Sequence, residues 1–307
     1  MPDRRTKIAS NSWRTRGDYI LYTPNELRYK DVGICTTPYS RLRHLALSIF
    51  LNQDLGQVWM GMFTAYFDSS GHENDQHVLL TAGYVSTVEK WLKLDQEWKN
   101  KLAEVGIECL HMHKLMRGEQ GPPEWKHDRE ARNRFLFSLV TVLKRRVHKG
   151  YACAVLLRDF REVDGQFTLS EQLGSPYTFI GSTIVHMVER WRTENYKHHP
   201  IRYFFEGGDA GQEDFSKFLR QSASIRPNFE DKWDKNTATW CYPFQVADFL
   251  AWVIAYHARL YAVEQPLELD PLYEHLERSI PSRWTIYEKD NLVRMCEELG
   301  VERRRQM

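Results

Sequence analysis

Two spacings of hydrophobic residues divide most of the chain after its first 60 residues into short strands and amphipathic helices. Trp91, Leu94 and Trp98 recur at steps of three and four, which predicts a helix, whereas the apolar run Phe63–Phe67 before Asp-Ser-Ser-Gly predicts a strand and a turn. Such patterns predict strands at 63–67, 78–85, 107–110, 151–157 and 201–205, and helices at 91–105, 129–147, 177–192, 212–221, 243–262 and 290–299. The first two strands are close enough in sequence to form a hairpin. Because strands and helices alternate after it, we expect an α/β fold with a mixed sheet.

The first 57 residues show neither spacing over a long stretch. They hold nine Lys or Arg against five Asp or Glu, a net charge of +4, so the rest of the chain carries −3. We therefore expect 1–57 to be a poorly packed basic N-terminal extension. Residues 58–307 are expected to form a single α/β domain with a C-terminal helical addition. A basic arm that contacts nucleic-acid phosphate is the functional alternative for the extension.

Composition and charge exclude several classes of protein. The 307 residues are enough for a hydrophobic core without disulfide or metal support. The 42 basic and 41 acidic residues leave a net charge of +1, which excludes a strongly basic nucleic-acid coat but not a local basic patch. No stretch of roughly 18 apolar residues occurs, so we expect no membrane span. Five scattered cysteines, without a CxxC pair or a signal peptide, predict reduced thiols in a cytoplasmic protein and argue against a cysteine-based zinc site.

Three acidic residues stand where the pattern calls for apolar ones. Asp68 follows the first predicted strand, Glu206 ends the strand at 201–205, and Asp248 interrupts a helix that is apolar almost all round. A carboxylate in a buried helix is costly unless it is paired or binds a metal. No basic residue lies within one helical turn of Asp248, which favours a functional role over a buried salt bridge. Ligands of α/β sheets bind at the carboxyl ends of strands, so Asp68 and Glu206 reach one crevice if their strands are parallel neighbours. The alternative for Asp68 is a turn-opening role.

One histidine and several tryptophans are further candidates. His111 follows the predicted strand at 107–110 and is a candidate for proton transfer or phosphate contact, with a histidine hydrogen-bonded at the sheet edge as the alternative. Trp125, Trp233 and Trp240 fall in polar loops and are candidates for stacking on bases. Tryptophans at helical core positions, among them Trp252, are expected to pack.

Two sequence motifs resemble one family. The segment FTAYFDSSG at 63–71, followed by LLTAGYV at 79–85, resembles the opening hairpin of the prokaryotic domain-of-unknown-function family 3800, with its Asp-Glu-Ser-Gly-like turn and a strand that runs into a glycine. The segment FQVADFLA at 244–251 resembles the same family's Gln-hydrophobic-Ala-Asp-hydrophobic-Leu-Ala helix, and Cys109–His111 resembles its short strand ending in His. The resemblance covers about Met62 to Ala262. The family is grouped with ribonuclease-H-like folds, and its members are suspected to be metal-dependent nucleases.

The resemblance implies a fold and a site. The fold would be a ribonuclease-H-like mixed sheet with flanking helices. The site would hold two divalent ions, Mg²⁺ or Mn²⁺, about 4 Å apart between acidic side chains. Asp68 would bridge the ions from the central strand, and Glu206 and Asp248 would each complete one ion. Two departures stand against this picture, because Ser69 replaces the family's Glu and Glu206 stands where Asp is expected.

Three functions follow from these residues. The first is a divalent-metal-dependent nuclease that hydrolyses phosphodiester bonds in DNA or RNA, with Asp68, Glu206 and Asp248 as metal ligands and His111 as a further catalytic residue. The second is a catalytically weakened ribonuclease-H-like module that binds nucleic acid or a protein, which the loss of the Glu next to Asp68 favours. The third is a phosphatase with Asp68 as nucleophile, although that chemistry usually wants a second acid two residues on, where the chain has Ser70.

Overall fold

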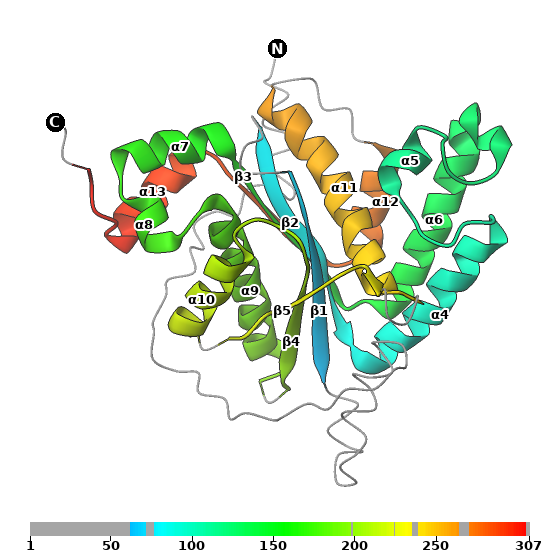
Figure 1. Cartoon of the computed structure of the whole chain (residues 1–307), viewed down its shortest axis with the longest axis horizontal. Helices are drawn as coiled ribbons and strands as arrows, with labels where there is room; N and C mark the ends of the chain where they lie inside the picture. Colours follow the sequence, from blue (N-terminus) through cyan, green and yellow to red (C-terminus); the bar gives the residue numbers. More distant parts are fainter. Residues whose placement is uncertain are drawn as a thin grey trace, which may run out of the picture.

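A central sheet covered by helices on both faces forms the described part of the chain (Figure 1). The computed structural model describes residues 62–71, 77–197, 199–223, 225–234, 239–263 and 270–304. The extension predicted at 1–57 lies outside these residues. None of the described helices is both long and apolar enough to span a membrane.

The sheet is mixed, with the strand order β5-β4-β1-β2-β3-β8. Its strands are β1 (Phe63–Ser70), β2 (Val78–Thr87), β3 (Lys149–Leu156), β4 (Ile201–Glu206), β5 (Asn228–Glu230) and β8 (Ser282–Tyr287). Strands β1, β2 and β3 form an antiparallel meander, whereas β4 runs parallel to β1, β5 parallel to β4, and β8 parallel to β3. A separate pair of short antiparallel strands comprises β6 (Trp233–Asp234) and β7 (Thr239–Trp240). The predicted opening hairpin and the mixed α/β sheet with flanking helices are confirmed.

The helices form one layer on each face of the sheet (Figure 1). One layer contains α4 (Val88–Glu104), α5 (Met112–Met116), the 3₁₀ helix η3 (Pro123–Lys126), α6 (Arg129–Arg146), α11 (Tyr242–Ala262) and α12 (Pro271–Ser279). The other contains α7 (Leu157–Gln166), α8 (Leu169–Leu173), α9 (Pro176–Asn195), α10 (Gln212–Ala223) and α13 (Lys289–Leu299). Because strand side chains alternate between faces, the sheet contributes to a separate hydrophobic core on each side.

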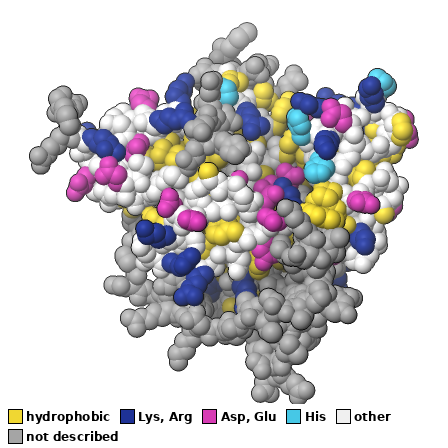
Figure 2. Space-filling view, in the orientation of Figure 1, with side chains coloured by type: hydrophobic (Ala, Val, Ile, Leu, Met, Phe, Trp, Pro, Cys, Tyr) yellow, Lys and Arg dark blue, Asp and Glu magenta, His cyan; other side chains and the backbone are white. Residues whose placement is uncertain are grey.

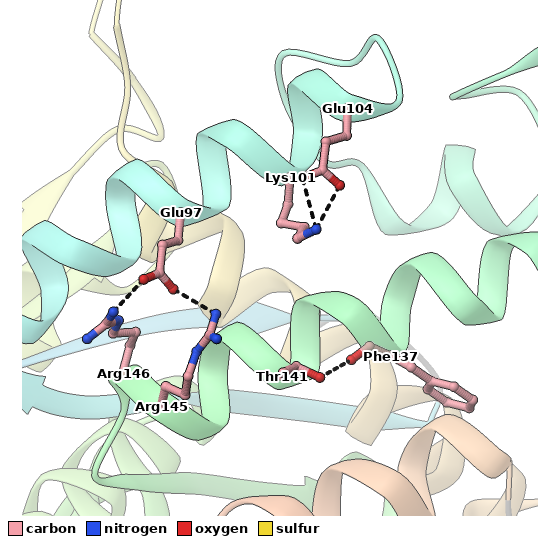
Figure 3. Close-up of polar contacts among 7 residues, drawn as sticks. All are labelled: Glu97, Lys101, Glu104, Phe137, Thr141, Arg145 and Arg146. Carbon is pink, nitrogen blue, oxygen red and sulfur yellow. Dashed lines mark hydrogen bonds and ion pairs between the residues drawn. The ribbon is translucent and has the colours of Figure 1, made fainter.

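Side-chain contacts fix α4 and α6 against each other and against the sheet. Asp128 begins α6, where its Oδ1 accepts a hydrogen bond from the Ala131 amide at 2.8 Å. The indole Nε1 of Trp91 in α4 donates to the Thr64 carbonyl of β1 at 3.0 Å. Glu97 of α4 forms ion pairs with Arg146 and Arg145, which both lie at the end of α6 (Figure 3). The distance from Arg145 Nη2 to Glu97 Oε2 is 3.1 Å. The Arg146 hydrogen bond lowers the pKa of Glu97 below its ordinary range. These two arginines therefore join helices.

The predicted strand at 107–110 is wrong. Residues 107–110 lie in a connecting segment between α4 and α5, although Leu110 is fully buried. Side-chain amides replace strand partners here, because Gln120 Oε1 accepts from the His111 amide at 2.9 Å and Gln245 Oε1 accepts from the Leu110 amide at 3.0 Å. A four-residue apolar run does not show by itself whether its buried backbone pairs with a strand or with side chains.

Candidate functional site

Asp68 and Glu206 lie side by side at the carboxyl ends of two parallel strands. Phe67 of β1 is in register with Phe205 of β4, and each acid is the next residue along its strand. Tyr66 and Phe204, two residues earlier, stack on the same sheet face with ring centroids 4.9 Å apart. Because side chains of a strand alternate, Asp68 and Glu206 also point to that face, which α11 covers. The two strands are thus parallel neighbours, which is the condition under which both carboxylates reach one crevice.

Helix α11 brings Asp248 to the same place. Buried alanines of this helix, Ala247, Ala251 and Ala258, let it lie close against β1 and β2. Gln245 fixes its position, because the Gln245 Oε1 accepts from Trp98 Nε1 at 3.3 Å in addition to the Leu110 amide. The two polar residues of the 244–251 motif therefore have different roles. Gln245 positions the helix, whereas Asp248 faces the ends of β1 and β4.

The three acids meet at the ammonium group of Lys232. Its Nζ lies 3.2 Å from Asp68 Oδ2, 2.6 Å from Glu206 Oε2 and 3.8 Å from Asp248 Oδ1. No two of these oxygens are therefore further apart than about 7 Å, the sum of the two longer distances. Figure 2 shows acidic side chains near the centre of this face, with a basic side chain among them. The three acids therefore converge at one place, as a shared metal site would require.

Sequence reasoning missed Lys232. It follows two acids, Glu230 and Asp231, in a short charged stretch that is typical of a solvated loop and gives no sign of burial. The tertiary structure brings Lys232 to the acids, because it follows the short edge strand β5. Its carbonyl also accepts a hydrogen bond at 2.8 Å from the amide of Cys241, the residue just before α11.

The cluster is partly buried and carries an excess of negative charge. The side chains of Asp68, Glu206, Asp248 and Lys232 are 7%, 22%, 28% and 23% exposed. With every group ionised, the three acids and one lysine carry a formal charge of −2. Burial raises the pKa of Asp68 well above its ordinary range, and hydrogen bonding with Glu206 raises it further, while Lys232 opposes both. Burial likewise raises the pKa of Asp248 to about 6, against the opposing effect of Lys232. For Lys232, burial lowers the pKa, but the three carboxylates outweigh it and leave the pKa above its ordinary value.

His111 lies at the margin of this cluster. It is exposed at the start of α5, and its ring meets Trp240 edge to face at a centroid distance of 6.3 Å. Its pKa is lowered by burial and by Lys114, while Asp248 acts in the opposite direction. The shift favours the neutral imidazole, which is the form that can accept a proton. No hydrogen bond joins it to the acids among the described contacts.

Of the three tryptophans that were candidates for base stacking, two lie near the acids and one is buried elsewhere. Trp233 and Trp240 form a cross-strand pair with centroids 4.7 Å apart, directly after Lys232 in the chain and before α11. Trp125, by contrast, is buried against Phe135, so it is a packing residue and the expectation of base stacking there is wrong.

Ser69 points away from the acids. Its hydroxyl lies 3.2 Å from Thr81 Oγ1 on β2, and strand alternation places it on the face opposite Asp68. Its backbone amide donates to Asp68 Oδ1 at 2.9 Å and so helps to orient that carboxylate. The residue that departs from the family motif thus contributes its backbone to the site.

The donors fit a divalent cation in chemistry and charge. Carboxylate oxygens are the ligands that Mg²⁺ and Mn²⁺ prefer, and the three acids outnumber the one lysine beside them. Glu206 Oε2 is buried, and the Lys232 ammonium 2.6 Å away is its charged partner. The described side chains do not, however, include a group of three or more His, Cys, Asp and Glu in a metal-holding arrangement. The acids close around the Lys232 ammonium, which would have to leave before an ion could contact all three.

Comparisons with known proteins give only distant similarities. No family model matches the chain, and no curated protein matches it. A chain of the PCNA–RNase HII complex from Archaeoglobus fulgidus is 14% identical, with a TM-score of 0.34 over 71% of this chain and 87% of that one. The ribonuclease H2 from Pyrococcus horikoshii OT3 is 13% identical, with a TM-score of 0.30 over 66% and 74%. Membership of family 3800 stays a prediction, and the fold class rests on the strand order and directions given above.

Proposed function

We propose that this protein is a divalent-metal-dependent nuclease with Asp68, Glu206 and Asp248 as the metal ligands. The observation that carries the proposal is the meeting of these three acids, from two strands and a helix far apart in sequence, around one cation. Buried acids without a structural purpose are selected against by their desolvation cost. Three of them at the carboxyl edge of a sheet, with a formal charge of −2 when they and Lys232 are all ionised, are best explained by a ligand that is itself a cation.

Each residue then has a distinct part in phosphodiester hydrolysis. A bound divalent ion polarises the phosphoryl oxygen and lowers the pKa of bound water. Asp68 is the most buried of the three acids and lies beside Glu206 and Lys232, so it would be the central ligand of the ion. Lys232, once it leaves the carboxylates, remains beside the site as a donor to a phosphate oxygen. His111 is the candidate to accept or return a proton, because its lowered pKa favours the neutral imidazole.

Cleavage assays test this function directly. The full chain is incubated with end-labelled single- and double-stranded DNA and RNA in Mg²⁺, Mn²⁺ or EDTA. We expect cleavage in at least one metal, none in EDTA, and a loss of at least 100-fold in Asp68→Asn. The matched control is Asp95→Asn, since burial also raises the pKa of Asp95 to about 6 but Asp95 lies on α4 and makes no ion pair with Lys232 among the described contacts. Metal-independent cleavage, or equal activity of both variants and the parent, would refute the assignment.

A second function is favoured by one observation. As folded, the acids are neutralised in part by Lys232 and do not present a metal-holding arrangement. A catalytically weakened module that binds nucleic acid or protein would have this property. It predicts nucleic-acid binding that EDTA does not change and no cleavage in any metal, so the same assay separates the two functions.

A further inference from the structure

The exposed apolar surface of the described residues is concentrated on one helix. Tyr256 and Val263 are the exposed large hydrophobic side chains of this part of the chain, at 46% and 42% exposure, and they lie in and directly after the second half of α11. Isolated exposed apolar residues need no explanation, but here they share a helix with one of the three acids.

Side chains on the outer side of α11 form a row that begins at the acid cluster. Asp248, Trp252 and Tyr256 are spaced by four residues and therefore share one face of the helix. At about 1.5 Å per residue, Trp252 lies about 6 Å and Tyr256 about 12 Å beyond Asp248 along the axis. The two rings are stacked, with centroids 5.9 Å apart and planes 10° from parallel. Arg259, exposed and three residues further on, adds a positive charge to the same side. Trp252 packs against the core as expected, but it is only partly buried.

We propose that this α11 face, formed by Trp252, Tyr256 and Arg259, binds the single-stranded stretch of a nucleic-acid substrate that leads away from the scissile phosphate. The proposal rests on the proposed function, because Asp248 fixes where the strand begins, and it adds that the substrate is single-stranded at this point. Aromatic rings stack with bases of any sequence, and an arginine completes such a surface by contacting phosphate.

Two features select a single strand over a duplex. Stacking on a side chain needs a base whose face is free, and in a duplex both faces are covered by neighbouring base pairs. Trp252 and Tyr256 already stack on each other, so a free base extends this stack at the exposed Tyr256 ring. The acid cluster itself repels phosphates, so an uncharged aromatic surface beside it supplies affinity that the site lacks.

Binding without cleavage provides the test. Fluorescence anisotropy of 5′-fluorescein-labelled (dT)₁₂ and (rU)₁₂, and of a 12-base-pair duplex, is measured with the full chain in EDTA. We expect Tyr256→Ser to weaken single-strand binding by about 5- to 150-fold and Tyr256→Phe by no more than about twofold, because the phenylalanine ring still stacks. Arg259→Gln should reduce the slope of log affinity against log salt by about 0.7. The control is Val263→Ser, which removes exposed apolar surface of the same region without removing a ring.

The outcomes separate this proposal from its alternatives. Parent-like single-strand binding by Tyr256→Ser, or a parent that binds the duplex as tightly as the single strand, overturns it. A dimer in solution that both Tyr256→Ser and Val263→Ser dissociate would assign the surface to a second copy of the chain and would also overturn it. Because every binding measurement is made in EDTA, a parent that binds strands through Tyr256 but never cleaves them refutes the nuclease function and leaves the stacking surface standing.

Discussion

Replacing Lys232 by Met is the change that tests the charge balance of the site. Methionine keeps most of the volume of the lysine stem but removes the cation, so three carboxylates within about 7 Å of one another face each other without a counter-charge. Removal of one partner from a buried ion pair costs roughly 3–5 kcal/mol. Asp68 is buried, but Glu206 and Asp248 are 22% and 28% exposed. Water therefore screens part of the repulsion, and we expect a loss of about 3 kcal/mol at pH 7, or about 6–12 °C in melting temperature.

The loss in Lys232→Met should depend on pH and on metal. Without the ammonium, the pKa values of Asp68 and Asp248 rise further above their ordinary values. An acid with a raised folded-state pKa destabilises the fold increasingly as pH rises through that range, so the loss should shrink towards pH 5 and be largest at pH 8. A divalent cation replaces the missing charge, and at a hundredfold excess over its dissociation constant it returns about 2.7 kcal/mol.

The measurement is a set of thermal and urea melts of parent and variant at pH 5, 7 and 8, with EDTA or with Mg²⁺. Lys217→Met is the control, because Lys217 is exposed on α10 and its replacement should change stability by no more than about 0.5 kcal/mol. A loss in Lys232→Met that neither low pH nor metal reduces would show that Lys232 is a packing residue, and the reasoning would be refuted.

Three further changes give independent tests. In EDTA, Asp248→Asn should be about 1–2 kcal/mol more stable than the parent above pH 6 and equal to it near pH 4, because the pKa shift from 3.8 to about 6 corresponds to about 3 kcal/mol before partial exposure is considered. Added Mg²⁺ should stabilise the parent more than the variant. Urea melts in a pH series measure both effects, and a loss of stability in the variant that does not depend on metal would contradict the ligand assignment. Gly83→Ala should destabilise the fold by about 3 kcal/mol or more, since an added Cβ would overlap the backbone oxygen of Tyr66 on the neighbouring strand, and a parent-like melt would contradict that packing. Burial, aided by Lys90, lowers the pKa of His148 from 6.5 to about 4, so its contribution to stability is present above pH 6.5 and is lost as pH falls towards 4. The stability of His148→Gln should accordingly fall less over that interval, and identical pH profiles would show that the histidine is not buried in the neutral form.

Hydrophobic spacing was sufficient for the elements that pack on a continuous apolar face. Helices α4, α6, α9, α10, α11 and α13, and strands β1 to β4, lie within a few residues of the predicted ranges, because local periodicity decides which face each can bury. Hydrophobic spacing did not predict the shorter elements. Strand β5 has three partly exposed residues, and its sequence, Asn-Phe-Glu, becomes a strand only because the edge of β4 offers hydrogen-bond partners.

The sequence by itself determined which acids are out of place, and tertiary structure decided what surrounds them. An aspartate in the apolar helix 243–262, and acids at the ends of two apolar runs, are visible as exceptions to a local pattern. That β4 lies parallel beside β1 depends on a crossover of more than 100 residues, so no local pattern encodes the distance between Asp68 and Glu206. Lys232 depends wholly on this arrangement, because a lysine in a charged segment has no hydrophobic period to reveal it. Its ammonium is held among the acids by charge attraction across a folded sheet edge, and that attraction exists only after the strands have paired.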